Sequence, residues 1–281
     1  MNIEEIKADD SNKDDSANEW RKEDLYQFKF LGKFITDKDA EPSWFKSMGK
    51  KENIELMAKW GLTEKDMDLA KFRFNQSFNI FNTDKFVKDL LNSYELRTAM
   101  PNLWSKLPAT VDSVQYEKLT TEVINMGFFD ILWEKDIATE TGYIKKEPDE
   151  LLDGMQMGDR LRYALAFEES EHYLCFDSEM RKEFIFRVFQ HIALGGTICQ
   201  YEDTINEYLT STQLAYKDLV TVFKDSETKE IKVGSVVLQI NGVDGSDLFG
   251  DSVHPQNWMY VIIDPLHWHV NVWFHKWTSW W

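Results

Sequence analysis

The sequence predicts an α+β protein, with an antiparallel β-meander in the C-terminal third packed against helices and an α/β N-terminal half. Two observations lead to this class. The first half combines helical patterns with a strand pattern of period two. The last third contains four β-rich runs separated by polar or Pro/Gly turns: residues 219–223, 231–240, 258–264 and 267–277.

The strand of the first half is predicted from the run KFRFNQSFNIF, residues 71–81. Its alternating residues are typical of a strand with one buried face, which carries Phe72, Phe74, Phe78 and Ile80. We expect a helix to follow this strand directly.

Helices are predicted where apolar residues recur at three- and four-residue spacing. The residues 82–84, Asn-Thr-Asp, offer caps for a helix that buries Phe86, Val87, Leu90, Leu91 and Tyr94. We also expect a strand over residues 119–124, and after it an amphipathic helix that contains Phe128, Phe129, Leu132 and Trp133.

Within the C-terminal meander, the run WMYVIID (258–264) is apolar on both faces. We therefore expect a central strand, with helices covering the side that the other sheet face leaves open. The short connection DSETKE (225–230) joins the first two runs, and residues 264–267, Asp-Pro-Leu-His, predict a tight turn with Pro at its second position.

Residues 1–19 differ in composition from the rest of the chain, since they hold seven acidic residues, two basic residues and no aromatic residue. Such a segment cannot bury enough apolar surface to fold, so we expect a flexible acidic tail. No repeat, heptad series or Gly-, Ser- or Pro-rich linker follows. Residues 20–281 are therefore expected to form a single globular α+β domain.

The formal net charge of -17 disfavours phosphate backbones and anionic lipids, so we expect no nucleic acid and no membrane among the partners. No uncharged apolar run approaches the roughly 18 residues that span a bilayer, and the first residues do not form a secretory signal. The two cysteines, Cys175 and Cys199, suit a reducing compartment. We expect a soluble intracellular protein.

The stretch HIALGGTICQYED, residues 191–203, is predicted to be a corner between two helices. The first helix is capped by Asp177 or Ser178 and ends at Gly195 in the left-handed conformation. Its apolar residues include Phe184, Ile185, Val188, Phe189 and Ile192, and His191 lies on the edge of this stripe.

The second helix of the corner is predicted from the capping-box spacing of Thr197 and Gln200. Its apolar stripe holds Ile198, Tyr201, Ile205, Tyr208 and Leu209, and Cys199 lies on the border of that stripe. Glu202 falls inside the stripe. Because a buried carboxylate needs a partner, we expect an Arg, a Lys, His191 or backbone N–H groups beside it, or else exposure to solvent or another protein.

Two kinds of chemistry remain as alternatives to a purely structural role. A Cys199 thiolate activated by His191 would make a thiol-dependent enzyme, and an apolar pocket between sheet and helices would make a small-molecule binder. Ordinary packing explains both residues, however, so we expect no catalytic residue and no cofactor.

Metal sites are weakly indicated in two places. His267 and His269 lie close enough on one strand to share an ion, with Asp264 as a distant third ligand, whereas His275 lies too far along the strand. The loop 241–257 contains Asp244, Asp247 and Asp251 but lacks the spacing of a calcium loop. We expect no metal. The common nucleotide, hydrolase and zinc-protease motifs do not occur either.

The end of the sequence is rich in tryptophan, with Trp277, Trp280 and Trp281 in the last five residues. We expect these rings to fold back as a lid over the core, and the alternative is an anchor for a partner. Deletion of residues 278–281 would lower the melting temperature in the first case and weaken a complex in the second.

The run FIFRVFQHIALGGTICQYEDTINEYLTSTQLAYKDLVTV, residues 184–222, resembles the cilia- and flagella-associated protein 300 family. The matching motifs are Leu194-Gly195-Gly196, Cys199-Gln200-Tyr201-Glu202-Asp203 and Tyr216 to Val220. Weaker similarity covers most of the chain beyond the tail: Phe74 to Phe78, Asp84 to Val87, Phe128 to Ile137, Ile263 to Pro265 and His269 to His275.

The resemblance implies a non-catalytic factor for the assembly and transport of axonemal dynein arms, without catalytic residues or cofactor. The implied partners are dynein arm subunits, cytosolic dynein assembly factors and the intraflagellar transport machinery. The implied location is the cytoplasm and the cilium, including its axoneme. The acidic tail and the Trp-rich end are particular to this sequence.

Overall fold

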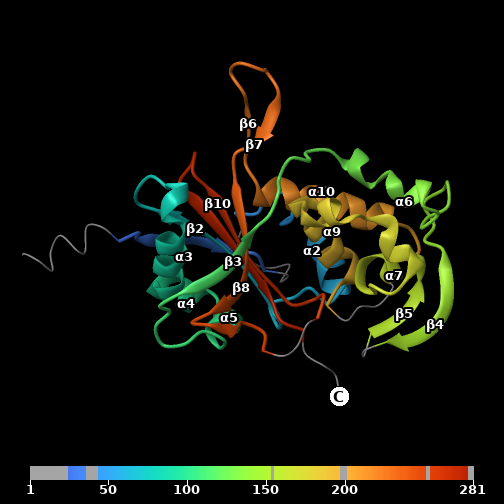
Figure 1. The fold of residues 1–281 in the computed structure, drawn as a ribbon, viewed down its shortest axis with the longest axis horizontal. Helices are drawn as coiled ribbons and strands as arrows, with labels where there is room; N and C mark the ends of the chain where they lie inside the picture. Colours follow the sequence, from blue (N-terminus) through green and yellow to red (C-terminus); the bar gives the residue numbers. More distant parts are fainter. Residues whose placement is uncertain (1–24, 36–43, 153–154, 197–200, 251–253, 278–281) are drawn as a thin grey trace, which may run out of the picture.

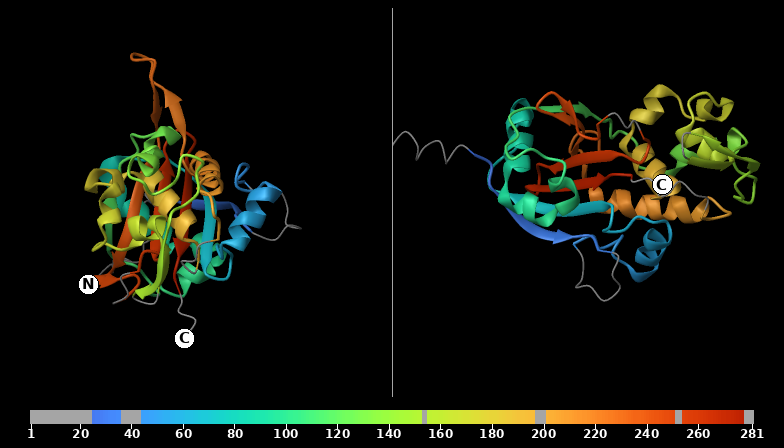
Figure 2. Two further views of the ribbon diagram at one scale, coloured as in Figure 1. Left: turned by 90° about the vertical axis from the view of Figure 1, so that its right-hand side faces the viewer. Right: turned by 90° about the horizontal axis from the view of Figure 1, so that it is seen from below.

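The computed structural model describes residues 25–35, 44–152, 155–196, 201–250 and 254–277. At its centre lies one antiparallel sheet (Figures 1 and 2), in the order β1 (Phe28–Lys33), β2 (Met67–Phe74), β11 (His269–His275), β10 (Trp258–Asp264), β8 (Val236–Val243) and β3 (Val114–Lys118). The short β9 (Ser246–Asp247) pairs with β8.

The predicted central strand is confirmed in β10, which lies between β11 and β8 and has all seven residues buried. Its apolar side chains are covered on both faces of the sheet because alternate residues point to opposite sides. The predicted turn after it is confirmed as well: Asp264 Oδ1 accepts the backbone N–H groups of Leu266 at 3.0 Å and His267 at 3.1 Å.

One face of the sheet is covered by three helices that follow β2 in the chain and lie together in Figure 1: α3 (Thr83–Asn92), α4 (Tyr94–Ala99) and α5 (Pro101–Trp104). Helix α3 packs Phe86, Val87, Leu90 and Leu91 against strand residues such as Phe72 and Val261. This layer is the smaller of the two hydrophobic cores.

The opposite face carries the larger core. Around it lie α2 (Lys51–Lys59), α6 (Ile131–Glu134), α7 (Arg160–Ala166), α8 (Ser178–Lys182), α9 (Phe184–Leu194) and α10 (Asn206–Leu219), with the 3₁₀ turns η2 (Met126–Phe129) and η3 (Glu171–Cys175). The 3₁₀ turn η1 (Ile80–Asn82) directly precedes α3. Two hairpins stand apart from the central sheet: β4 (Lys146–Leu152) with β5 (Met155–Asp159), and β6 (Val222–Lys224) with β7 (Ile231–Val233). The predicted α+β class is confirmed.

Several predicted boundaries in the first half are wrong. Strand β2 ends at Phe74, because the Asn79 side chain caps the N–H of Phe81 and turns the chain into η1. Tyr94 does not belong to the buried stripe of α3, because Ser93 caps a new helix, and its ring is exposed.

The region before α8 also differs from the prediction. No strand covers 119–124, since β3 lies just before it and the N–H groups of Glu122 and Val123 point to the Glu183 carboxylate instead. The expected helix around residue 130 is divided into η2 and α6, and the expected helix after Asp177 is divided at Glu183 into α8 and α9.

In the C-terminal third, only β8, β10 and β11 form the predicted meander. Leu219 is the last residue of α10, so the first β-rich run is confined to β6, and the run 231–240 is divided between β7 and β8 around Gly234. Among the described residues, no helix is both long enough and apolar enough to cross a membrane.

Candidate functional site

The corner after α9 is held against the end of α2. Gly195 ends α9 with a φ of 64°, as predicted, and the N–H of Gly196 donates to the Trp60 carbonyl at 2.7 Å. A Cβ on Gly195 would stand 2.6 Å from the Trp60 oxygen, and a Cβ on Gly196 would collide with the Gly61 carbonyl. Only glycine allows the two backbones to approach this closely.

The second half of the corner is not the predicted helix, because α10 begins only at Asn206. Residues 201–205 are irregular, and the Tyr208 hydroxyl accepts the N–H groups of Tyr201 at 3.2 Å and Glu202 at 3.1 Å. Thr197, Ile198, Cys199 and Gln200 lie outside the described residues, so the capping box is untested.

Glu202 has the partner that a carboxylate at this position requires. Its Oε1 lies 2.7 Å from Lys59 Nζ and accepts a hydrogen bond of 2.9 Å from Trp60 Nε1. The prediction of a nearby Lys is confirmed, although the carboxylate reaches it from irregular chain and not from a helix. With a side chain only 13% exposed, Glu202 joins the corner to α2.

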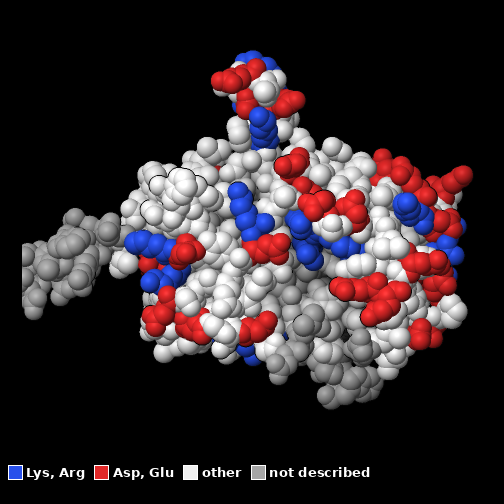
Figure 3. Space-filling view, viewed as in Figure 1, with Lys and Arg blue, Asp and Glu red and all other residues white. Residues whose placement is uncertain are grey.

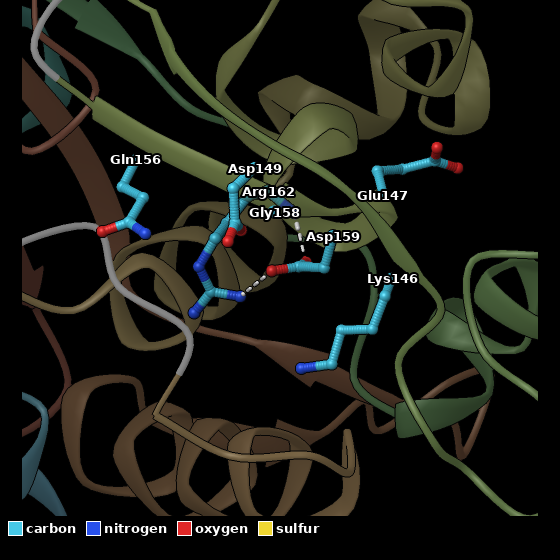
Figure 4. A pocket seen from close by; sticks show the side chains of 7 residues that line it. All are labelled: Lys146, Glu147, Asp149, Gln156, Gly158, Asp159 and Arg162. Carbon is cyan, nitrogen blue, oxygen red and sulfur yellow. Dashed lines mark hydrogen bonds and ion pairs between the residues drawn. The ribbon is translucent and has the colours of Figure 1, made fainter.

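Beneath the corner lies a fully buried ion pair, shown in Figure 4. Arg162 Nη1 donates to Asp159 Oδ2 at 2.8 Å, while Asp159 Oδ1 caps α7 by accepting the Arg162 N–H at 2.9 Å. Arg162 Nη2 also reaches the Ala193 carbonyl at 3.2 Å. The pair borders a pocket of about 450 Å³, and its contacts tie α7 to the end of α9.

His191 was predicted to lie on the edge of the apolar stripe of its helix, but it is fully buried, with only 2% of its surface exposed. Gln256 donates through Nε2 to the His191 carbonyl, so its Oε1 accepts from His191 Nδ1, and His191 Nε2 accepts from the Tyr260 hydroxyl at 2.7 Å. Burial and the nearby Arg187 charge hold the pKa of His191 well below its usual range. The imidazole is neutral and already engaged.

The two cysteines do not present a reactive thiol in the described part of the chain. Cys175 is buried, and burial raises its pKa to about 11, so the thiol stays protonated at neutral pH. Cys199 lies outside the described residues, and its pairing with His191 is therefore untested.

Several of the residues weighed as metal ligands have polar protein partners. Asp264 Oδ2 accepts from Thr221 Oγ1 at 2.6 Å and lies 2.8 Å from His267 Nδ1. Asp244 Oδ1 accepts the N–H groups of Asp112 and Ser113. Asp251 lies outside the described residues. Within the described ranges, no group of three or more His, Cys, Asp or Glu side chains is arranged to hold a metal ion.

Trp277, the last described residue, packs on the body of the protein. Its ring stacks on His254 with centroids 4.1 Å apart, and its N–H donates to Asn257 Oδ1 at 2.9 Å. Trp280 and Trp281 lie outside the described residues, so the choice between a lid and a partner anchor stays open for them.

The β6–β7 hairpin projects from the body of the molecule, as Figure 1 shows above α10. Its strands pair only with each other in the described structure, and Val222, Phe223 and Ile231 are 52%, 40% and 54% exposed. Sequence reasoning assigned these residues to the main sheet, because β propensity does not tell which sheet a strand joins. A separate hairpin is indicated by the charged turn DSETKE between two very short apolar runs.

Both ends of this hairpin are fixed. At the tip, Asp225 Oδ1 accepts the N–H groups of Glu227 and Thr228, and Lys232 lies 2.9 Å from Asp225 Oδ2. The hydrogen bond from Lys232 is the largest cause that lowers the pKa of Asp225. At the base, Thr221 donates its N–H to Ser235 Oγ and its hydroxyl to Asp264.

The charges on the body give no sign of a nucleic-acid surface in the face that Figure 3 shows, where Lys and Arg are scattered among Asp and Glu. The features together define an α+β protein whose corner residues hold the fold and whose projecting hairpin presents exposed apolar side chains.

The chain belongs to the cilia- and flagella-associated protein 300 family, whose model matches residues 39–275. It is 34% identical to cilia- and flagella-associated protein 300 of Paramecium tetraurelia over 231 residues, which cover 82% of this chain and 90% of the relative. It is 29% identical to the protein of that name from Chlamydomonas reinhardtii over 236 residues, 80% of this chain and 91% of the relative. No solved structure matches the chain. The family predicted from the corner motif is confirmed.

Proposed function

We propose that this protein is a non-catalytic protein-binding factor in the assembly and ciliary transport of axonemal dynein arms. Its proposed partners are axonemal dynein arm subunits, cytosolic dynein assembly factors and the intraflagellar transport machinery. It works in the cytoplasm and in the cilium, including the axoneme. The relatives support the ciliary part of this proposal, because both are named for their association with cilia and flagella.

The observation that carries protein binding is the β6–β7 hairpin. Exposed apolar side chains on a projecting element are a common feature of protein interfaces. The hairpin is held at tip and base before any partner arrives, so docking on it orders few further groups and costs little entropy. Its outer strand edges also offer backbone groups to a partner strand.

The test compares affinity purifications of the full chain from ciliating cells. The wild-type chain should recover dynein arm chains, assembly factors or transport-train subunits. The double variant Val222→Ser, Ile231→Ser should recover roughly tenfold less, because it removes apolar contact area from the hairpin. Its melting temperature should stay close to that of the wild type, since both side chains are more than half exposed.

A matched control is the double variant Tyr94→Ser, Leu174→Ser, which removes two side chains that are 78% and 77% exposed elsewhere on the surface. Recovery should stay at the wild-type level. Equal recovery by both double variants would refute the hairpin as the interface. Absence of all three partner groups from the wild-type sample would refute the proposed function, and loss of ciliary function in Cys199→Ala would favour the thiol enzyme.

A further inference from the structure

A second cavity, of about 500 Å³, lies between α9 and the interior strands β8 and β10 of the main sheet. Its volume falls in the range of small-molecule sites. Part of its wall is apolar, with Leu165, Phe167 and Phe249 among the lining residues. Several polar side chains share the same cavity, and their hydrogen-bond partners decide what it can hold.

The first of these is Arg187 on α9, one turn before His191. Its Nε is buried and has no acceptor among the described residues, while Nη1 makes one long contact of 3.4 Å with Gln190 Oε1. No carboxylate in the described ranges forms an ion pair with this guanidinium. A half-buried cation without a counterion is costly, and the cost disappears when an anion binds beside it.

The second is His254, in the loop before β10. The N–H of Gln256 donates to its Nδ1 at 3.1 Å, so Nδ1 is the acceptor and the neutral ring carries its proton on Nε2. Burial, and then the nearby His275, lower the pKa of His254 to about 4, which keeps the ring neutral at physiological pH. That Nε2 is buried and has no acceptor in the described structure.

A buried acceptor and three acidic residues complete the lining. Gln239 Oε1, on β8 opposite Tyr260, receives no hydrogen bond from a described group. Glu168, Glu169 and Asp247 also line the cavity. Their charges repel any anion, and a dianion about twice as strongly as a monoanion, so a single negative charge held directly by Arg187 is favoured over two.

We propose that this cavity binds an organic monocarboxylate with an apolar body. The carboxylate accepts from Arg187, a further acceptor of the ligand receives the Nε2 proton of His254, and the body packs on the apolar wall. Gln239 Oε1 accepts an N–H of the ligand where one is present. Such a carboxylate occurs in free carboxylic acids and at the C-terminus of a peptide, and this ligand site is separate from the hairpin interface.

The test measures binding to the full chain by isothermal titration calorimetry. The probes are 3-phenylpropionate, N-acetylphenylalanine, N-acetylphenylalanine amide, which lacks the carboxylate, and phenyl phosphate, which carries two charges. We expect saturable binding of at least one carboxylate, roughly tenfold tighter than that of the amide and of phenyl phosphate. Tighter binding of N-acetylphenylalanine assigns the site to a peptide terminus, and tighter binding of 3-phenylpropionate assigns it to a free acid.

Variants separate a ligand contact from a structural role. Arg187→Gln should weaken carboxylate binding at least tenfold and leave the melting temperature of the ligand-free protein unchanged or higher, because it removes an unpaired cation. Arg187→Lys should retain part of the affinity, and Arg73→Gln, at an exposed position on β2, should change nothing. The proposal is overturned if neither carboxylate binds, if Arg187→Gln binds as well as the wild type, or if phenyl phosphate binds most tightly.

Discussion

Glu202 illustrates how one carboxylate holds two kinds of donor. Lys59, half exposed, gives an ion pair that solvent screens, whereas the indole N–H of the buried Trp60 donates a hydrogen bond to the same carboxylate oxygen. Surface ion pairs contribute little, but a buried donor that loses its acceptor is expensive. The indole hydrogen bond is therefore the more important contact for stability.

Two substitutions at this residue separate the contacts. Glu202→Gln keeps an oxygen for Trp60 and should change the free energy of unfolding by less than about 1 kcal/mol. Glu202→Leu leaves the indole N–H without its acceptor and should cost about 1 to 3 kcal/mol. Urea unfolding measures both. If the two variants lose the same amount, the ion pair carries the stability.

The surroundings of a single side chain could be predicted only where its neighbours in the sequence determine them. The need of Glu202 for a partner follows from its apolar neighbours alone. The depth of His191 does not, because the groups that cover it, Tyr260 and Gln256, come from β10 and from the loop before it. Helical periodicity describes only the face that a helix itself presents.

At the scale of elements, β10 could be predicted with its correct ends, because a continuous apolar run is bounded by polar residues and Pro265. The β6–β7 hairpin could not be predicted as a separate element, because its two short apolar runs fit strands of the main meander equally well. The break between α8 and α9 at Glu183 could not be predicted either, because it depends on residues far away in the sequence. The role of Glu183 as acceptor for residues 122 and 123 depends on a contact about sixty positions away.

The approach of the corner to α2 gives an element-scale prediction. Gly196→Ala should lower the stability by about 2 kcal/mol or more, because its Cβ meets the Gly61 carbonyl and one of the two segments must move. Gly245→Ala is the control: it has a φ of 76° but open space around a Cβ, so it measures backbone strain alone, about 1 kcal/mol. Thermal unfolding compares them, and equal losses would contradict a close contact at Gly196.

On the scale of the whole molecule, the two cores share their strands. Tyr260 points into the larger core and Val261 into the smaller one, so neither layer separates without breaking β10. We therefore predict that residues 20–281 unfold as one domain. Scanning calorimetry should show a single transition with equal calorimetric and van't Hoff enthalpies.

Stability should also depend on pH through three imidazoles, the buried His191 and His275 and the half-buried His254. Burial lowers the pKa of each below 6.5, to about 4 for His254. Below about pH 6.5 the unfolded chain consequently binds more protons than the folded one. The contribution of these groups to the free energy of unfolding is therefore fully present above about pH 6.5 and is lost as the pH falls towards 4.

Each such group contributes a slope of about 1.4 kcal/mol per pH unit while only the unfolded form titrates. Urea unfolding at a series of pH values measures it. His254→Asn keeps an acceptor for the Gln256 N–H and should make the slope shallower in this window. An unchanged slope would show that His254 does not contribute.

The pairing of β2 with β11 has a consequence for synthesis of the chain. Leu69 lies opposite Trp273, so β2 is synthesised long before the strand with which it pairs. Until then a nascent chain on the ribosome carries Phe72 and Phe74 on a strand whose inner edge has no neighbour. Long-range pairing of this kind slows folding and favours aggregation. The inner edge of β2 is therefore expected to stay unpaired for longer during synthesis than the edge that pairs with β1.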